Sequence, residues 1–182
     1  ERTPFAGARA LLETATGDVL DLGCGAGPYA DLLQPRVAEQ QLSYVGVDPD
    51  EHALGRVRAA WPDVELLAAE GEDLSPLGER TFDRVFVLRS WNHLHDPDAV
   101  MVEVLRHLRE DGELVVSDDV AFGLARSAPQ ARVGEREGAF EHHRNDGLDA
   151  CARVLERHGL HVFERHDVER QTSNRWLLRA RR

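Results

Sequence analysis

Short apolar runs alternate with longer amphipathic stretches along most of this chain of 182 residues. A short apolar run bounded by turn residues is typical of a buried strand, whereas apolar residues spaced about three or four apart are typical of a helix. The apolar runs predict strands over 19–22, 43–47, 64–67, 82–87, 113–117, 161–163 and 176–178.

The amphipathic stretches between these strands predict the helices. In the first half of the chain we expect helices over 5–15, 29–33 and 51–61. The second of these ends or kinks near Pro35, because a proline removes a hydrogen bond from a helix interior. The stretch 121–145 has no periodic pattern, and we expect a loop or a lid there.

Two further helices have clear start and stop signals. Asp96 is a good N-cap for the first, with Pro97 in its opening turn, and Asp146 is able to cap the second, which Gly159 ends. The first has the apolar face Val100, Val104, Leu105 and Leu108 and is followed by Gly112; the second has the face Leu148, Cys151, Ala152 and Leu155.

The order of these elements predicts the fold class. Strands separated by helix-length segments imply βαβ units and a parallel sheet. The last two strands have no helix between them, which implies a hairpin at one edge of the sheet. We therefore predict a single α/β domain, doubly wound, with a mostly parallel sheet of seven strands, an antiparallel edge hairpin and helices on both faces. A chain of this length is long enough to bury a core of its own.

The most specific local pattern lies between the first strand and the next helix. Asp21 is followed by Gly23, Gly25 and Gly27 at alternate positions. Glycines in such a turn let the backbone bend sharply and let a ligand approach without a Cβ in the way. The pattern alone also fits a turn without a ligand or a nicotinamide-dinucleotide site. Pro28 argues against the dinucleotide, because it stands where that fingerprint has its last glycine.

A second acid, Asp48, ends the next strand. At the carboxyl end of a strand, about twenty residues after a glycine turn, an acid accepts both hydroxyls of a ribose in nucleotide-binding sheets. The alternative is that Asp48 caps the following helix, with Pro49 as its first residue. We favour the ribose.

With these residues in place, the chain resembles a class I S-adenosylmethionine-dependent methyltransferase, in particular the small-molecule group that includes the ubiquinone and menaquinone biosynthesis enzymes. The segments that carry the resemblance are 19–27, 44–48, 70–74, 82–85, 91–97 and 112–118. The resemblance implies a Rossmann-like fold, one S-adenosylmethionine-binding domain over 1–182, and S-adenosylmethionine as the methyl donor. Family members usually carry further helices upstream, so we expect native residues before Glu1.

The resemblance also implies roles for the residues of both turns. Gly23, Gly25 and Gly27 would line the methionine and ribose part of the cofactor, and Asp21 would lie near its amino group. Asp48 would hold the ribose hydroxyls.

The adenine and methionine ends are implied in the same way. Pro49 or Asp50 would flank the adenine. Glu70 would accept a hydrogen bond from the adenine amino group, and the backbone of Gly71 would lie beside it. The family usually has Asp-Ala where this chain has Glu70-Gly71. Leu88, at the end of the fourth strand, would face the methionine part.

Methyl transfer depends mainly on holding the nucleophile in line with the methyl carbon, and a base is needed only when the nucleophile carries a proton. The candidate bases are His93, His95, His142 and His143, of which we favour His93, His142 and His143. The family usually has His-His where this chain has Asn92-His93. The alternatives are a structural histidine in a turn at His93 and a solvated pair in a loop at His142 and His143.

Candidate substrate residues follow the fourth strand and the unpatterned stretch. Arg89, Trp91 and Arg144 are expected to shape a substrate pocket, and the two arginines favour an anionic group. Asp118 and Asp119 lie where metal-dependent O-methyltransferases place carboxylate ligands, but no third ligand is evident, so we predict no metal.

Composition narrows the choice of partners. The formal net charge of −11 argues against a nucleic acid, and no apolar run reaches the ~20 residues that cross a bilayer. Two cysteines give neither a disulfide framework nor a metal-ligand spacing. We expect a cytoplasmic protein that acts on a small molecule, without nucleic-acid or membrane partners, as a homodimer or as part of a larger chain.

The leading hypothesis is methyl transfer to an O, N or C nucleophile of a small molecule, for example in secondary metabolism. One alternative is a catalytically weak S-adenosylmethionine-binding module of a larger protein. Another is a nucleic-acid or protein methyltransferase, which is disfavoured by the acidic balance and by the lack of an Asn/Asp-Pro-Pro-Tyr motif after the fourth strand.

Overall fold

The computed structural model describes residues 7–119, 144–167 and 175–182. None of the helices in these three ranges has the length and apolar character that a membrane crossing requires. With η denoting a 3-10 helix, the elements in chain order are α1 (Ala8–Glu13), β1 (Gly17–Leu22), α2 (Ala30–Ala38), β2 (Leu42–Asp48), α3 (Glu51–Ala60), β3 (Glu65–Ala68), η1 (Ser75–Leu77), β4 (Phe82–Leu88), η2 (Trp91–His93), α4 (Pro97–His107), β5 (Leu108–Asp119), α6 (Leu148–Arg157), β6 (His161–Asp167) and β7 (Arg175–Arg181).

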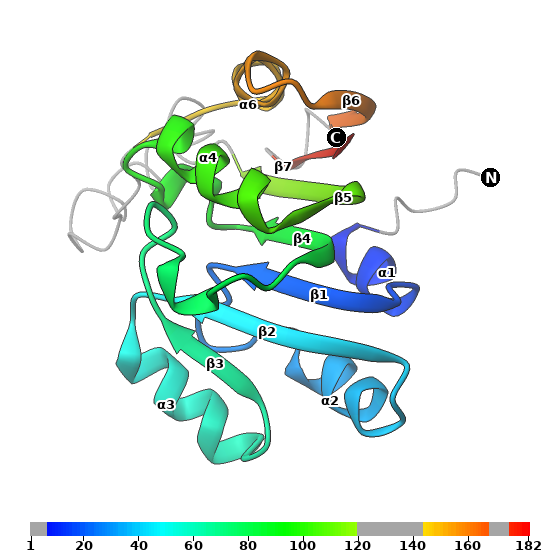
Figure 1. The fold of residues 1–182 in the computed structure, drawn as a ribbon, viewed down its shortest axis with the longest axis vertical. Coiled ribbons are helices and arrows are strands. Elements are labelled where there is room, and N and C mark those ends of the chain that lie inside the picture. Colours follow the sequence, from blue (N-terminus) through cyan, green and yellow to red (C-terminus); the bar gives the residue numbers. More distant parts are fainter. Residues whose placement is uncertain (1–6, 120–143, 168–174) are drawn as a thin grey trace, which may run out of the picture.

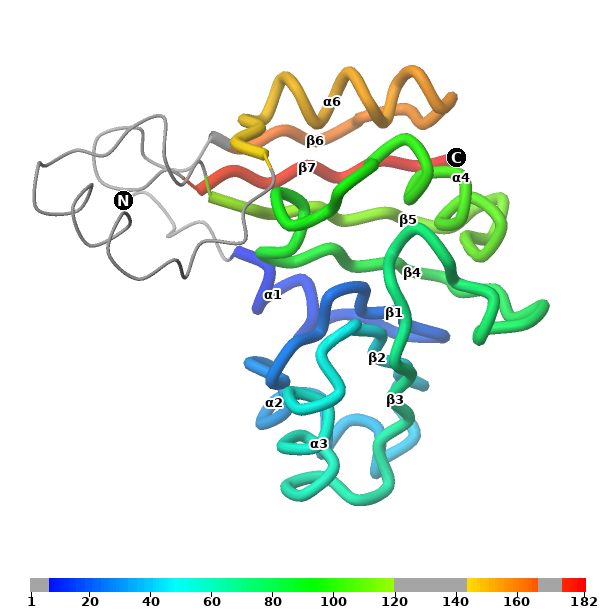
Figure 2. Tube along the Cα trace, turned by 90° about the vertical axis from the view of Figure 1, so that its left-hand side faces the viewer, coloured from blue at the N-terminus to red at the C-terminus, as the bar shows by residue number. Residues whose placement is uncertain are grey.

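The strands form one seven-stranded sheet in the order β3-β2-β1-β4-β5-β7-β6 (Figure 1). The first five strands pair in parallel, and β7 runs antiparallel to both β5 and β6. Figure 2 shows β4, β5, β7 and β6 side by side. The prediction of a doubly wound, mostly parallel sheet with an antiparallel edge pair is confirmed. The strand order reverses between β1 and β4, and such a switch point is where open α/β sheets bind ligands.

Alternation along each strand divides the core into two layers, because successive side chains of a strand point to opposite faces. Leu20 of β1 packs in the layer that α4 and α6 cover, whereas Val19 packs in the layer that α1, α2 and α3 cover. On β5, Val116 and Val115 divide in the same way. The helices therefore cover both faces, as predicted.

Two predicted boundaries are wrong. The helix end expected near Pro35 is wrong, because α2 continues to Ala38 and the amide of Glu39 donates to the carbonyl of Pro35 at 2.9 Å. The alternative, a kink at Pro35, stays a prediction. The Arg36 side chain ties this turn to the segment that follows α1, since its guanidinium donates to the carbonyl of Ala15 at 2.5 Å. The tertiary contacts of this turn hold the helix together where the proline removes one of its hydrogen bonds.

The second wrong boundary lies at the end of α4. The helix ends at His107, and Leu108, expected on its apolar face, begins β5 and pairs with Phe82. Gly112 therefore lies within β5 instead of beyond a helix end. A Cβ on Gly112 would come within 2.9 Å of the Arg109 carbonyl oxygen, so a close approach of the backbone requires this glycine.

The helix caps agree with the sequence in two of three places. The Asp96 side chain accepts from the amide of Asp98 at 3.0 Å, and Gly159 follows α6 with φ of 84°. Asp146, however, does not cap α6, whose N-cap is Gly147. Its carboxylate instead accepts from the indole nitrogen of Trp91 at 3.2 Å, a contact that only the fold creates.

Helix α4 offers a matched pair of valines that tests the two-layer core. Val104 is fully buried, while Val102 on the same helix is 52% exposed. We expect Val104→Ala to lower the free energy of unfolding by about 2 kcal/mol, through lost burial and a residual cavity. Val102→Ala should change it by less than about 0.5 kcal/mol. Urea unfolding measures both, and equal effects of the two substitutions would contradict this packing.

Candidate functional site

The glycine turn after β1 is attached to the end of β2. The amides of Gly23 and Cys24 both donate to the carbonyl of Val47, at 2.7 and 3.1 Å. The amide of Gly25 donates to the Asp48 carboxylate at 2.8 Å. The two motifs that the sequence singled out thus meet at the carboxyl edge, by which we mean the edge of the sheet where β1 to β5 end and β7 begins.

The three glycines of the turn have different neighbours. All three have positive φ, at 79°, 51° and 69°, where residues with a Cβ are strained. A Cβ on Gly23 would lie 2.4 Å from the Cβ of Ser90, and one on Gly27 would lie 3.0 Å from a methyl group of Val57. Among the described residues, a Cβ on Gly25 would meet only the Asp48 carboxylate, at 3.9 Å. Packing therefore excludes a Cβ at Gly23 and leaves little room for one at Gly27, whereas the described residues leave space at Gly25.

Asp48 accepts one hydrogen bond on each carboxylate oxygen. Besides the bond from Gly25, the amide of Asp50 donates to its other oxygen at 2.9 Å. The N-cap of α3 is Asp50, which accepts from His52 and Ala53, so the alternative that Asp48 caps this helix is wrong. A carboxylate has about four acceptor positions, so Asp48 retains capacity for the two hydroxyls of a diol.

Asp21 is a buried acid beneath the turn, only 3% exposed. The hydroxyl of Tyr44 donates to its carboxylate at 3.0 Å. Burial raises the pKa of Asp21 to about 6, and the negative charge of Asp48 adds to the effect, while the bond from Tyr44 opposes it. A carboxylate in such surroundings gains stability when a cation comes beside it.

The residues predicted for the adenine and methionine ends follow β2, β3 and β4 at the same edge. Pro49 and Glu70 are exposed, and Gly71 is buried. A Cβ on Gly71 would lie 3.2 Å from the side chains of Leu94 and Val100, which explains why this position is small. Leu88 packs in the core and is 6% exposed. Their contacts with a cofactor stay predictions.

The other half of the carboxyl edge carries a short row of charges. Arg89, directly after β4, has φ of 60°, an unusual conformation for a residue with a side chain, and its side chain is 63% exposed. Its Nε lies 4.0 Å from the Asp119 carboxylate, and the Nε of Arg175 donates to the other oxygen of that carboxylate at 3.2 Å. Sequence patterns missed Arg175, because only the antiparallel pairing of β7 places it beside Asp119.

Behind this row, Asn92 is the centre of a buried hydrogen-bond network. Its backbone amide donates to the Asp118 carboxylate at 2.8 Å, and its side-chain amide donates to the backbone carbonyls of Asp119 and Asp146. The amide of Asp146 donates back to the Asn92 side chain at 2.8 Å. Asn92 thus joins the end of β5 to the segment before α6. The departure from the family's usual histidine was the only sign of it in the sequence.

Two of the predicted substrate residues belong to this network. Trp91 is fully buried and packs in the core. The Arg144 guanidinium lies over the Trp91 ring, 5.5 Å from its centroid, and forms an ion pair with Asp146. Burial lowers the pKa of Arg144, and its Nη1 is buried without a hydrogen-bond partner among the described residues. Both side chains therefore support the carboxyl edge from within, and a direct contact with substrate stays a prediction.

Of the candidate bases, His93 lies in η2 and is exposed, while His142 and His143 lie outside the described residues. Asp118 is 2% exposed and bound to the Asn92 amide. In the described ranges, no group of three or more His, Cys, Asp or Glu side chains is placed to hold a metal ion.

Comparison with known proteins identifies the family. The family described as "Methyltransferase domain" matches residues 20–116, which is more than half of the chain. The protein belongs to the S-adenosylmethionine-dependent methyltransferases. The match includes the glycine turn, Asp48 and the strands that position them, so the resemblance noted from the motifs is confirmed.

Individual methyltransferases agree with this assignment. The domain is 33% identical over 165 residues to the methyltransferase GfsG of Streptomyces halstedii, covering 85% of this chain and 56% of that protein. It is 32% identical over 137 residues to a trans-aconitate 2-methyltransferase of Azoarcus sp. BH72, covering 72% of this chain and 52% of that protein. The chain thus spans about half the length of these relatives.

A solved structure shows the same fold. The crystal structure of an S-adenosylmethionine-dependent methyltransferase from Mesorhizobium loti superposes with a TM-score of 0.73 and 20% identity, covering 96% of both chains.

S-adenosylmethionine is the cofactor of this family, and the residues of the methyltransferase domain fit it. The turn is open at Gly25, where a Cβ would otherwise fill the space. Asp48 retains acceptor capacity for a ribose diol beside that opening. Asp21 supplies a buried negative charge for a ligand that carries positive charge.

The different neighbours of the glycines lead to a test. We expect Gly23→Ala to destabilise the domain strongly, and the double variant Gly23→Ala/Ser90→Gly to recover part of the loss, because the clash is with the Cβ of Ser90. Gly25→Ala should cost only about 1–2 kcal/mol of stability, from its positive φ. It should nevertheless weaken binding of S-adenosylhomocysteine, the product that S-adenosylmethionine leaves after methyl transfer, at least about tenfold, because the new Cβ fills the opening. Thermal unfolding and calorimetry measure these effects. Equal loss of binding and stability in both single variants would contradict the distinction.

The raised pKa of Asp21 predicts a pH-dependent stability. The folded protein holds the Asp21 proton with a pKa of about 6, above the ordinary value near 3.9 of an unfolded chain. Stability is therefore lost as pH rises between these two values, and the loss is complete above the higher one. We expect Asp21→Asn to raise the free energy of unfolding by about 2 kcal/mol at pH near 8, and to have little effect at pH near 4. An effect of equal size at both pH values would exclude this account.

Proposed function

We propose that this domain transfers a methyl group from S-adenosylmethionine to an O, N or C nucleophile of a small-molecule acceptor. The observation that carries the proposal is the glycine turn that opens at Gly25 between the acids Asp21 and Asp48. The cofactor, when bound, supplies the electrophilic methyl group. Asp48 would then fix the ribose end, and the buried Asp21 would balance the positive charge.

The acceptor would occupy the other half of the carboxyl edge, next to β4 and β5. Arg89 and Arg175 place two guanidinium groups beside the carboxylate of Asp119, in a chain of net charge −11. Guanidinium groups bind carboxylates and phosphates by paired hydrogen bonds. An anionic acceptor therefore suits this edge, and the name of one relative, trans-aconitate 2-methyltransferase, refers to a carboxylate substrate.

For a nucleophile that carries a proton, His93 is the described candidate base, since it is exposed in η2 at this edge. His142 and His143 remain candidates from the sequence alone. The network around Asn92 would support this half of the site by holding Asp119 and Arg144 in place. Cytoplasmic location and a dimeric or larger assembly stay predictions.

Methyl transfer itself can be tested without knowing the acceptor. The domain is incubated with S-adenosylmethionine labelled in its methyl group and with a metabolite extract. We expect label to appear in a small anionic molecule. Binding of S-adenosylhomocysteine without transfer to any acceptor would favour the catalytically weak module, and absence of binding would contradict the proposal.

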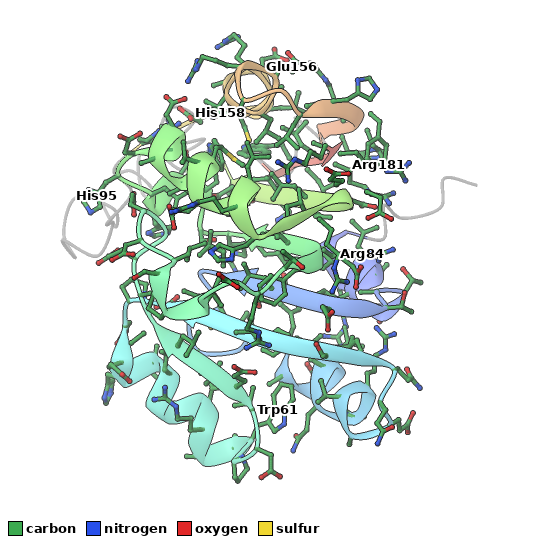
Figure 3. The ribbon with its side chains drawn as sticks, viewed as in Figure 1. Trp61, Arg84, His95, Glu156, His158 and Arg181 are labelled. Carbon is green, nitrogen blue, oxygen red and sulfur yellow. The ribbon has the colours of Figure 1, made fainter. Side chains whose placement is uncertain are left out.

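Two arginines toward opposite ends of β4 provide a controlled test of the acceptor edge. Arg89 follows the carboxyl end of β4, whereas Arg84 lies on the same strand toward its other end. Figure 3 shows Arg84 on the opposite side of the molecule from His95, which follows β4. With the labelled acceptor, we expect Arg89→Gln to lower kcat/KM about tenfold, mainly through KM, because a charged hydrogen bond is lost. Arg84→Gln removes the same charge and should leave kcat/KM unchanged. Equal effects would contradict anion binding at Arg89.

A further inference from the structure

The proposed cofactor site contains a buried acid with a single described hydrogen-bond donor. Asp21 lies near the end of β1, and the Tyr44 hydroxyl on the neighbouring strand β2 donates to it at 3.0 Å. The parallel register pairs Tyr44 with Val19, and Val19 lies two residues before Asp21, so all three side chains lie on the same face of the sheet. The tyrosine therefore reaches along that face to the acid.

The Tyr44 side chain is held in this position from two sides. Its ring stacks on Trp61 at the end of α3, with centroids 5.6 Å apart and an interplanar angle of 23°. The adjacent Gly46 leaves room for the hydroxyl, because a Cβ there would lie 3.1 Å from it and 2.8 Å from the sulfur of Cys24. The hydroxyl is thus in place before any ligand binds.

Tyr44 is a donor throughout the physiological pH range. Burial, together with the charge of Asp21, raises the pKa of Tyr44 well above its ordinary value, so the phenol keeps its proton. Burial also raises the pKa of Cys24, which leaves a neutral thiol beside the pair.

The remaining neighbours of Asp21 are acidic or neutral. The Asp48 carboxylate adds to the effect of burial on the pKa of Asp21, and the charge of Asp21 adds to the effect of burial in raising the pKa of Tyr29. None of the described residues that influence the pKa of Asp21 carries a positive charge. The bond from Tyr44 is therefore the described contact that favours the ionised acid before a cation arrives.

We propose that Tyr44 is a positioning residue, whose hydroxyl orients the Asp21 carboxylate and keeps it ionised so that it receives the positive charge of the bound cofactor. The inference rests on the proposed function, in which S-adenosylmethionine is the ligand. It follows that ligand binding and loss of the Asp21 proton are linked, and that Tyr44 determines the pH at which this linkage operates.

The test is the pH dependence of S-adenosylhomocysteine binding, measured by calorimetry between about pH 5 and pH 8.5. This product carries an ammonium group and serves as the probe. For the wild-type domain, the dissociation constant should rise as pH falls below about 6, because Asp21 becomes neutral. Tyr44→Phe removes one hydrogen bond to a charged group. The midpoint of the pH dependence of binding should therefore move upward by about one pH unit, and the affinity at the alkaline end should stay near that of the wild type. Asp21→Asn should bind weakly at every pH.

Tyr29→Phe is the matched control, because Tyr29 is the only other tyrosine in the chain. It removes the same hydroxyl from a residue that is not among the described hydrogen-bond partners of Asp21, and the midpoint of the pH dependence should stay in place. In this background, 3-fluorotyrosine labels Tyr44 alone. The hydroxyl of the fluorinated tyrosine is a stronger hydrogen-bond donor, so it should move the midpoint downward. Because 3-fluorotyrosine keeps the shape of the side chain, it also serves if Tyr44→Phe proves unstable.

The outcomes separate this inference from the proposed function. An unchanged midpoint in both Tyr44 variants would show that Tyr44 only packs, and pH-independent binding by the wild type would exclude the linkage. Either result leaves the proposed function intact. If the wild-type domain failed to bind S-adenosylhomocysteine at any pH, the proposed function would be wrong, and this inference with it.

Discussion

β1 pairs in parallel with β2 on one side and with β4 on the other, and the rest of the site depends on this pairing. It brings the carboxyl ends of the three strands to one edge and sends their helices to opposite faces. The glycine turn can then reach both neighbours: its amides bond to Val47 and Asp48, and Gly23 packs on Ser90. The switch point in strand order, where open α/β sheets bind ligands, is a consequence of that geometry.

The same edge combines a hydrogen-bonded network that supports it with a buried carboxylate that lowers stability. Asn92 and its partners satisfy most of the polar groups behind the acceptor half, and satisfied buried networks hold one arrangement of a core. In the cofactor half, Asp21 is buried with the single described donor Tyr44. An ionised acid in such surroundings lowers the stability of the domain, and a bound cation would stabilise its charge. This is a local conflict of the kind expected at a functional site.

The pattern of the chain predicted the seven strands, their mostly parallel order and the meeting of Asp21, the glycines and Asp48, because period and turn chemistry are local properties. It failed where a distant contact overrides a local preference. Arg36 holds α2 together past Pro35, and Asp146 binds Trp91 instead of capping α6. Neither partner is near in sequence, so no local signal marks them. Trp91 likewise follows a strand as a pocket residue would, but is fully buried.

The sequence by itself determined the family and the methyl donor, since an acid, three alternate glycines and a second acid at the next strand end form a pattern that a turn and two strands can express alone. Only the tertiary structure decided what each residue of the pattern does. Ser90 excludes a Cβ at Gly23, Val57 leaves little room at Gly27, the described residues leave space at Gly25, and Tyr44 donates a hydrogen bond to Asp21 from the next strand. These differences depend on which side chains the sheet brings within a few ångströms, and spacing along the chain does not encode that distance.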